Sequence, residues 1–288
     1  MNRRNFLGAA LTAGVLTPAF SQRLIATGQR SVSAPSTSSS SESSVRKRNL
    51  QVANSIQMCV FDTFGTLVDW RGSVIAEVEQ LARDKGWNLD AEAFAVAWRA
   101  NYGPSRNRVR TGDLPWTKLD DLHRMTLDDL LVQFQIQGLT EEEKVHLNKV
   151  WHRLHPWPSV PGGLARLKTR YVLSPLSNGN VALLTNMAKF GGIPWDCVLG
   201  SDVVRHYKPD REMYMMPGEF FDIPPSAVMM VAAHAGDLDS AKSYGLRTAY
   251  VHRPLERGPN APPWPLPEVG RFDFIATDFN DLASQLGL

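Results

Sequence analysis

From about residue 158 onward, short apolar runs alternate with segments of helical pattern. Five of these runs are predicted strands, and one further run precedes them, giving Ile56–Phe61, Tyr171–Leu176, Cys197–Leu199, Val228–Val231, Thr248–Val251 and Phe272–Ile275. Strands separated by helices favour a parallel sheet, because each parallel connection has to cross back over the sheet. We therefore expect an α/β fold.

A long helical stretch lies between the first predicted strand and the rest of this region. Within it, Thr140 followed three residues later by Glu143 indicates a helix start of the capping-box type. An insert at this point of the chain would cover the carboxyl edge of the sheet, where open α/β folds place their sites. We expect a core domain formed by 55–70 and 158–288, with a helical cap domain at 71–157.

The N-terminus has the pattern of an export signal. Arg3 and Arg4 precede Phe-Leu and a mild apolar run, and small residues favour cleavage after Ser21. The predicted twin-arginine signal is 1–21, which places the mature protein in the periplasm or outside the cell. A basic N-terminus without a targeting role is the alternative. The Ser-rich segment 22–54 buries too little apolar surface to fold, so a disordered linker is expected there.

The formal charge of +2 is unevenly distributed along the 288 residues. Residues 1–50 carry seven basic side chains and one acidic side chain, which leaves 24 basic and 28 acidic side chains in the remainder. A slightly acidic folded part does not favour a nucleic-acid surface. No run of 18 apolar residues occurs, so we expect no ordinary membrane span.

Several conspicuous side chains are expected to be structural. Cys59 and Cys197, the only cysteines, lie in apolar runs typical of small buried hydrophobes. His152 and His155 lie three residues apart on a predicted helix, but no carboxylate or cysteine with ligand spacing is near them, so solvated or capping roles are favoured over metal binding. Packing is likewise favoured for three tryptophans of the predicted cap, Trp116, Trp151 and Trp157.

Polar side chains follow four of the predicted strands. They are Asp62 with Thr66, Ser177 with Asn178, Lys208 with Tyr214, and His234 with Asp237. Taken singly, each pair has an ordinary explanation as a turn former, a solvated charge or a helix cap. Together they supply a nucleophile, hydroxyl and amide donors, a cation and a second carboxylate, which are the parts of a covalent displacement site.

The order of these motifs resembles the haloacid dehalogenase superfamily. The order is Asp-x-x-Gly-Thr, Ser-Asn, Lys-Pro-Asp and a closing Asp, and it covers essentially all of 55–288. The segments FDTFGTLVDW, LSNGN, YKPDREMY and VAAHAGDL, with Trp98-Arg99, are similar to the type II 2-haloacid dehalogenases. The resemblance implies a Rossmann-like core with a parallel sheet and an inserted helical cap. It also implies a homodimer.

Two positions favour a dehalogenase over a phosphatase. Phosphatases of this fold resemble Asp-x-Asp, in which the second acid protonates an alkoxide leaving group, whereas this chain has Phe64 there. Their Mg²⁺ is held by carboxylates, but Ala233 stands where the first acid of the last motif falls. A halide leaves without a proton, so no cofactor or metal is expected. A short 2-halocarboxylate is the expected substrate.

The resemblance assigns the chemical roles. Asp62 would attack the α-carbon and form an ester, with halide displaced. Arg99, from the cap, would meet the halide or the substrate. Lys208 would pair with the Asp62 carboxylate and keep it ionised, and Asp237 would orient or activate the water that hydrolyses the ester.

Further residues are assigned to substrate binding. Thr66, Ser177 and Asn178 would hydrogen-bond the nucleophile or the substrate carboxylate, and Tyr214 would line the pocket. His234 stands where better-known members of the family resemble Asn, and it is expected to donate to the substrate, to accept the proton of the water, or only to pack beside the site.

Two alternatives to the dehalogenase remain. One is a hydrolase of the same fold that acts on another small electrophile, phosphate esters included. The other is an exported protein that keeps the fold and only binds a small carboxylate. In addition, Pro217-Gly218 interrupts a helical pattern, which predicts a broken helix.

Overall fold

The computed structural model describes residues 47 and 49–288. The predicted signal and most of the predicted linker lie outside the described residues. The end of that linker differs from the prediction, because residues 49–55 are helical. Ala53 is fully buried, and its carbonyl accepts a hydrogen bond of 3.2 Å from the Tyr171 hydroxyl. This short helix therefore packs on the fold.

The core is one six-stranded sheet in the order β5-β4-β1-β6-β7-β8, and every neighbouring pair is parallel. The strands are β1 (Met58–Phe61), β4 (Val172–Ser177), β5 (Leu199–Gly200), β6 (Val228–Ala232), β7 (Arg247–Val251) and β8 (Phe274–Ala276). β1 lies in the middle, between β4 and β6, so the residue after it reaches the centre of the carboxyl edge. The predicted α/β fold is confirmed.

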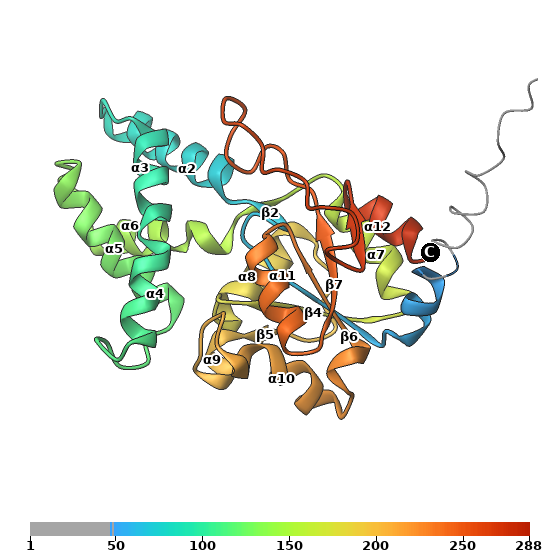
Figure 1. Cartoon of the computed structure of the whole chain (residues 1–288). Coiled ribbons are helices and arrows are strands. Elements are labelled where there is room, and N and C mark those ends of the chain that lie inside the picture. Colours follow the sequence, from blue (N-terminus) through green and yellow to red (C-terminus); the bar gives the residue numbers. More distant parts are fainter. Residues whose placement is uncertain (1–46, 48) are drawn as a thin grey trace, which may run out of the picture.

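Helices cover both faces of the sheet (Figure 1). On one face are α7 (Val160–Lys168), α8 (Val181–Gly191) and α12 (Phe279–Gln285), and on the other are α9 (Ser201–Val204), α10 (Arg211–Phe221) and α11 (Ala235–Ser243). The buried strand β1 alternates between the two sides, with Phe61 in the first apolar cluster and Val60 in the second. The one-turn 3-10 helix η2 (Pro225–Ala227) leads into β6.

A separate helical lobe follows β1, at the left in Figure 1. It contains α2 (Trp70–Lys85), α3 (Ala91–Ala100), α4 (Tyr102–Arg110), α5 (Leu119–Gln133), α6 (Glu141–Asn148) and the 3-10 helix η1 (Lys149–His152). The antiparallel pair β2 (Val68–Asp69) and β3 (His155–Pro156) brings its two ends together. The capping box predicted at Thr140 is present, with Glu143 reaching back to the Thr140 amide at 2.9 Å.

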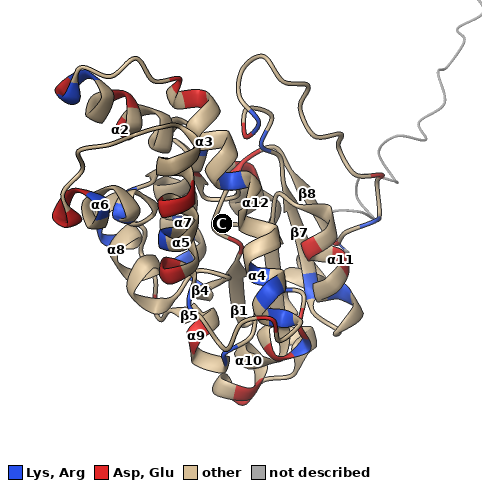
Figure 2. Ribbon diagram, turned by 90° about the vertical axis from the view of Figure 1, so that its left-hand side faces the viewer, with Lys and Arg blue, Asp and Glu red and all other residues tan. Residues whose placement is uncertain are grey.

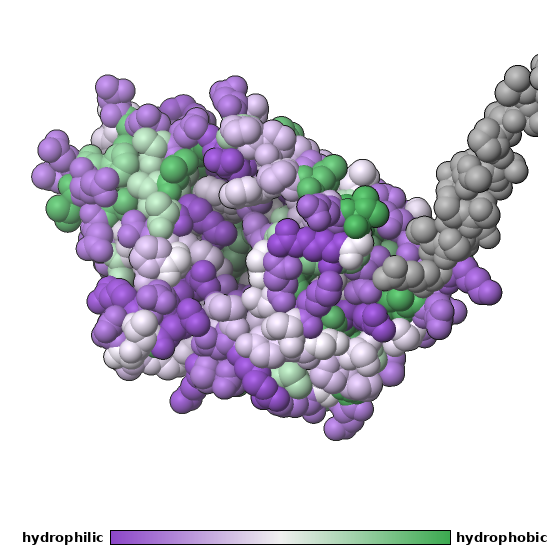
Figure 3. All heavy atoms as spheres, in the orientation of Figure 1, coloured by the Kyte–Doolittle hydropathy of each residue, from purple (hydrophilic) through white to green (hydrophobic). Residues whose placement is uncertain are grey.

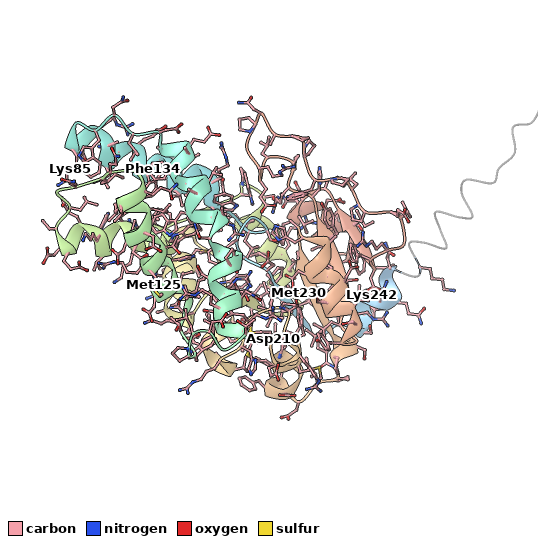
Figure 4. The ribbon with its side chains drawn as sticks, turned by 60° about the vertical axis from the view of Figure 1, so that its left-hand side comes forward. Lys85, Met125, Phe134, Asp210, Met230 and Lys242 are labelled. Carbon is pink, nitrogen blue, oxygen red and sulfur yellow. The ribbon has the colours of Figure 1, made fainter. Side chains whose placement is uncertain are left out.

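Polar contacts join the lobe to the sheet domain through α4. Arg110 pairs with Asp210, just before α10, at 2.7 Å, and Arg106 donates to the carbonyl of Lys208 at 3.2 Å. In Figure 2 the part of α4 that carries basic residues, drawn blue, lies above α10, and Figure 4 labels Asp210 near the lower end of α4. The lobe therefore rests on the segment that carries one of the predicted site residues.

Two predictions are wrong. The helix expected to break at Pro217 is continuous, since α10 runs from Arg211 to Phe221 and ends only where Asp222 takes a left-handed conformation. Proline removes one backbone donor, and burial of this part of α10 against the sheet keeps the helix in place. His152 is neither solvated nor a cap: it is buried, with one ring nitrogen 2.9 Å from Asp120 and the other 3.0 Å from Asn186.

Among the described residues, no helix is both long and apolar enough to cross a bilayer.

Candidate active site

Four segments meet at the carboxyl edge of the sheet. Asp62 directly follows β1, Asn178 follows β4, and His234 lies two residues beyond β6. Lys208 lies between β5 and α10, and Asp237 lies in the first turn of α11. The parallel topology brings these side chains together, because each comes from the same end of the sheet.

Lys208 lies between the two carboxylates of the site. Its Nζ is 2.6 Å from Asp237 Oδ2 and 3.3 Å from Asp62 Oδ1, and all three side chains are largely buried. Burial alone would raise the pKa of Asp62, but the charge of Lys208 and a hydrogen bond from His234 outweigh it and hold that pKa below its ordinary value. The pKa of Lys208 is raised, because the attraction of both carboxylates exceeds the cost of burying the ammonium. Asp62 is thus kept ionised.

The two oxygens of Asp62 have different surroundings. Oδ2 accepts from the Thr66 hydroxyl at 2.8 Å and from His234 Nδ1 at 3.0 Å. The Thr66 hydroxyl in turn accepts from the Ala233 amide at 2.9 Å, which fixes its direction. Among the described residues, Oδ1 has only the longer contact of 3.3 Å to Lys208. Oδ1 is therefore the less fully hydrogen-bonded of the two oxygens.

Asp237 is held by two donors. Tyr214 donates to Oδ1 and Lys208 to Oδ2, each at 2.6 Å. Burial and the neighbouring charge of Asp62 raise the pKa of Asp237, partly offset by Lys208. Burial also raises the pKa of Tyr214, so its hydroxyl keeps its proton. A carboxylate whose pKa is raised in this way is suited to accept a proton from water.

Ser177 and Asn178 have different surroundings. Asn178 accepts from the backbone amide of Lys208 at 2.8 Å and donates to the Tyr102 hydroxyl at 3.1 Å, so it joins the sheet to the lobe. Ser177 is fully buried, and its hydroxyl accepts from the Gly179 amide at 3.2 Å. Ser177 therefore supports the turn and, like Thr66, does not line the cavity.

Aromatic side chains form the side of the site that faces the lobe. We call the group Phe64, Arg99, Tyr102, His123 and Trp151 the aromatic wall. The Arg99 guanidinium lies 4.0 Å from the centre of the Tyr102 ring and 5.7 Å from that of Phe64. His123 stacks on Trp151 at 4.4 Å, and burial lowers its pKa to about 3, so it is neutral. Within the described part of the chain, Arg99 Nη1 and both ring nitrogens of His123 are buried without a hydrogen-bond partner.

These groups enclose a cavity of about 360 Å³. The surface is hollowed between the helical lobe and the sheet domain in Figure 3. The cavity is lined by Asp62, Phe64, Arg99, Tyr102, Arg106, Asn178, Lys208, Pro209, Tyr214, His234, Gly236, Asp237 and Ser240. Charged groups at the sheet and aromatic groups at the lobe suit a small anion with an electrophilic carbon.

Four residues of the cavity, the aromatic wall and the surroundings of His234 were missed in the sequence. Tyr102, Arg106 and His123 come from the lobe, where no strand end marks a site. Glu256, which accepts from His234 Nε2 at 2.8 Å, lies in the long loop after β7. Only its place beyond a strand end could have indicated it.

The described residues contain no group of three or more His, Cys, Asp or Glu side chains arranged to hold a metal ion. At the two positions where metal-dependent relatives of this fold were expected to carry acids, Phe64 is buried among aromatic rings and Ala233 is buried beside Thr66.

Known proteins resemble the chain in both sequence and structure. The family model for the haloacid dehalogenase-like hydrolases matches residues 56–245. (S)-2-Haloacid dehalogenase 1 of a Pseudomonas species, strain CBS-3, is 29% identical over 208 residues, which is 69% of this chain and 85% of that protein. A solved L-2-haloacid dehalogenase is 42% identical with a TM-score of 0.77, covering 81% of this chain and 99% of its own. A solved defluorinating L-2-haloacid dehalogenase is also 42% identical, with a TM-score of 0.75, and covers 81% and 96%.

Proposed function

The chain belongs to the haloacid dehalogenase-like hydrolases, and we propose that it hydrolyses the carbon–halogen bond of short 2-haloalkanoic acids to give 2-hydroxy acids. Relatives named as (S)- or L-2-haloacid dehalogenases support this reaction and the L configuration of the substrate. The observation that carries the proposal is the ionised carboxylate of Asp62, which lines a cavity without an acid at position 64 and whose Oδ1 contacts Lys208.

In the first step Asp62 Oδ1 attacks the α-carbon. The carbon–halogen bond breaks with its electron pair on the halide, and an aspartyl ester forms. The substrate carboxylate is a charged group that the cations Arg106 and Lys208 can balance. Arg99, whose Nη1 has no hydrogen-bond partner among the residues that the structure describes, is suited to the departing halide.

In the second step a water attacks Cγ of the Asp62 ester. Asp237 takes a proton from the water, and the carbonyl electron pair moves to Oδ2. When the Cγ–Oδ1 bond breaks, the departing alkoxide needs a proton. Lys208 lies within 3.3 Å of Oδ1 and 2.6 Å of Asp237, so it can donate that proton and recover it from Asp237. The Asp62 carboxyl formed in this way releases the second proton of the water to solvent, which regenerates the carboxylate with an oxygen from water.

The test is halide release from monochloroacetate and from both enantiomers of 2-chloropropionate, with a chelator present. We expect release from the acetate and one enantiomer, and its loss in Asp62→Asn. Asp239→Asn is the matched control, because Asp239 is an exposed carboxylate of α11 that pairs with Arg271. Activity on phosphate esters alone, and only with Mg²⁺, would favour the phosphatase. Binding of the acids without release would favour the carboxylate-binding protein.

Two properties outside the site are also proposed. Arg3 and Arg4 with the apolar run after them support export to the periplasm or beyond, with a mature protein that starts at Gln22. Sequencing the N-terminus of the mature protein tests this, and a cytoplasmic protein that starts at Met1 would contradict it. The family resemblance supports a homodimer, which light scattering tests through a molar mass twice that of the chain.

A further inference from the structure

His234 is held between two carboxylates. Its Nδ1 lies 3.0 Å from Asp62 Oδ2, and its Nε2 lies 2.8 Å from Glu256 Oε1. Glu256 is itself buried, with 6% of its surface exposed, and its second oxygen accepts from Trp264 Nε1 at 3.2 Å. The imidazole therefore connects the nucleophile to a fixed buried acid from the loop after β7.

The hydrogen-bond pattern determines the protonation state of this histidine. Ionised carboxylates only accept hydrogen bonds, and a neutral imidazole has a single N–H, so the two contacts need both ring nitrogens protonated. Burial lowers the pKa of His234, but the hydrogen bonds and charges of Asp62 and Glu256 outweigh it and raise that pKa to about 10. His234 is thus a cation at neutral pH.

The nucleophile loop leaves room for Glu256. Gly65 has a φ of +85°, and a Cβ at this position would overlap the Glu256 carboxylate. The glycine that follows the nucleophile therefore serves two purposes, since it permits the turn and admits the acid against His234.

On the basis of the proposed function, we propose that His234 is a catalytic residue of the second step, the cationic donor that stabilises the oxyanion on Asp62 Oδ2, with Glu256 as the positioning residue that keeps it charged. When water attacks Cγ, the carbonyl electron pair moves to Oδ2, which already faces the Thr66 hydroxyl and His234 Nδ1. Donors fixed before charge develops stabilise such an intermediate without reorganisation. When the Cγ–Oδ1 bond breaks, the pair returns, so His234 neither gains nor loses a proton.

The same cation has the opposite effect on the first step. During alkylation the negative charge moves from Asp62 to the halide, away from His234. A cation beside the carboxylate therefore stabilises the starting state more than the transition state. His234 should favour ester hydrolysis and slightly disfavour ester formation.

This arrangement excludes His234 as the base for the water. A base needs a nitrogen lone pair, whereas both nitrogens face carboxylates at hydrogen-bonding distance. The two roles of His234 predict opposite pH dependences of ester hydrolysis. A cationic donor is lost as the pH rises, so hydrolysis slows, whereas a base becomes active as the pH rises, so hydrolysis speeds up.

The experiment separates the two steps in the full chain with 2-chloropropionate. Rapid-quench measurement of halide in the first turnover reports ester formation, and intact-protein mass reports the decay of the ester. The variants are His234→Ala, His234→Asn, which keeps an uncharged donor, and Glu256→Gln. Glu268→Gln is the matched control, because Glu268 is an exposed acid of the same loop, and His234 Nε2 is hydrogen-bonded to Glu256 instead.

We expect His234→Ala to slow ester decay about 100-fold, while first-turnover halide release is unchanged or faster. The ester then accumulates. His234→Asn should lose about tenfold, since the donor remains and the charge does not. Glu256→Gln should lower the alkaline limit of ester decay by about one pH unit or more, and Glu268→Gln should change neither step.

The charge of His234 is measured separately by nitrogen chemical shifts of ¹⁵N-histidine-labelled protein. Several charged groups surround this ring and can influence its pKa. Asp62 and Glu256 contact the ring, and Lys208 and Asp237 lie beyond Asp62. Glu268 and Arg271 line a second cavity, which His234 also lines. We expect a doubly protonated ring at pH 8 in the wild type, and a neutral ring at a lower pH in Glu256→Gln than in Glu268→Gln.

A neutral ring in the wild type at pH 8 would overturn the inference whether or not the protein releases halide. So would a normal halide burst followed by undiminished ester decay in His234→Ala, equal slowing of both steps, or ester decay in Glu256→Gln that rises with pH through the histidine titration. Failure of the proposed function is distinct: the wild type then gives no halide and no ester, and the oxyanion role is rejected with it.

Discussion

The two sides of the cavity differ in how far their polar groups are satisfied. On the sheet side, Lys208, Asp237 and Tyr214 are joined by contacts of 2.6 Å, so their charges are balanced before any substrate arrives. In the aromatic wall, Arg99 Nη1 and the ring nitrogens of His123 are buried without a partner in the described chain. A buried unpaired donor costs free energy. The difference agrees with the proposed function, in which the sheet side prepares the nucleophile and the wall offers a donor to an anion that arrives later.

The largest effect is expected from removing the central cation of the sheet side. Lys208→Met leaves Asp62 and Asp237 as two buried carboxylates without their shared partner. We expect the free energy of unfolding to fall by about 3–5 kcal/mol and halide release to fall at least about 1000-fold. Denaturant unfolding and steady-state halide assays measure the two effects. Lys242→Met is the control, because Lys242 is exposed on α11 (Figure 4) and only donates to the Arg271 carbonyl. Full activity in Lys208→Met would remove the distinction between the two sides.

A smaller and more selective effect is expected in the wall. Arg99→Met keeps an unbranched apolar side chain in the wall and removes the guanidinium that lies over Tyr102. First-turnover halide release should fall about 100-fold, while decay of the ester is unchanged and the free energy of unfolding shifts by less than about 0.5 kcal/mol. Arg108→Met, on the exposed side of α4, is the control. Equal slowing of halide release and of ester decay would contradict a role of Arg99 in halide departure alone.

The third effect is the pH dependence of the stability that His234 contributes. The pKa of His234 is raised from 6.5 to about 10 in the folded protein, so its charge contributes stability below pH 6.5 that is lost as the pH rises toward 10. The free energy of unfolding of the wild type minus that of His234→Asn should therefore decrease across this range, by about 1 kcal/mol since the ring is partly exposed. A difference that grows with pH would show a neutral histidine.

The smallest effect is expected where the two sides touch. Tyr102→Phe keeps the ring over Arg99 and removes the hydroxyl that accepts from Asn178. The loss of one hydrogen bond is about 1 kcal/mol, so kcat/KM should fall about fivefold. Tyr102→Leu, which also removes the ring, should cost more. If kcat/KM falls equally in both variants, the Tyr102 ring contributes nothing to activity.

The sheet side was largely predictable from the sequence, and the wall was not. Asp62, Lys208 and Asp237 each follow a strand of apolar pattern, and parallel topology alone brings strand ends to one edge. Arg99 was assigned by resemblance, but His123 and Tyr102 come from helices whose rotation and packing depend on the whole lobe. Local pattern does not encode which helix face meets a cavity.

Two differences from prediction have the same origin. Pro217 was expected to break a helix, and His152 was expected to be solvated or to cap a helix. In both cases tertiary contacts outweigh the local signal, since α10 packs against the sheet and Asp120 and Asn186 satisfy a buried ring. Glu256 was missed for the same reason, because the folding of the loop after β7 brings it to His234.

The central claim is that Asp62 forms an ester that water cleaves at Cγ. The most direct measurement is a single turnover in H₂¹⁸O with enzyme in excess over 2-chloropropionate, followed by mass analysis of the Asp62 peptide and of the product. We predict ¹⁸O in the Asp62 carboxylate and an unlabelled hydroxyl in the 2-hydroxypropionate. An unlabelled Asp62 with ¹⁸O in the product would contradict the claim, because water would then have attacked the α-carbon directly.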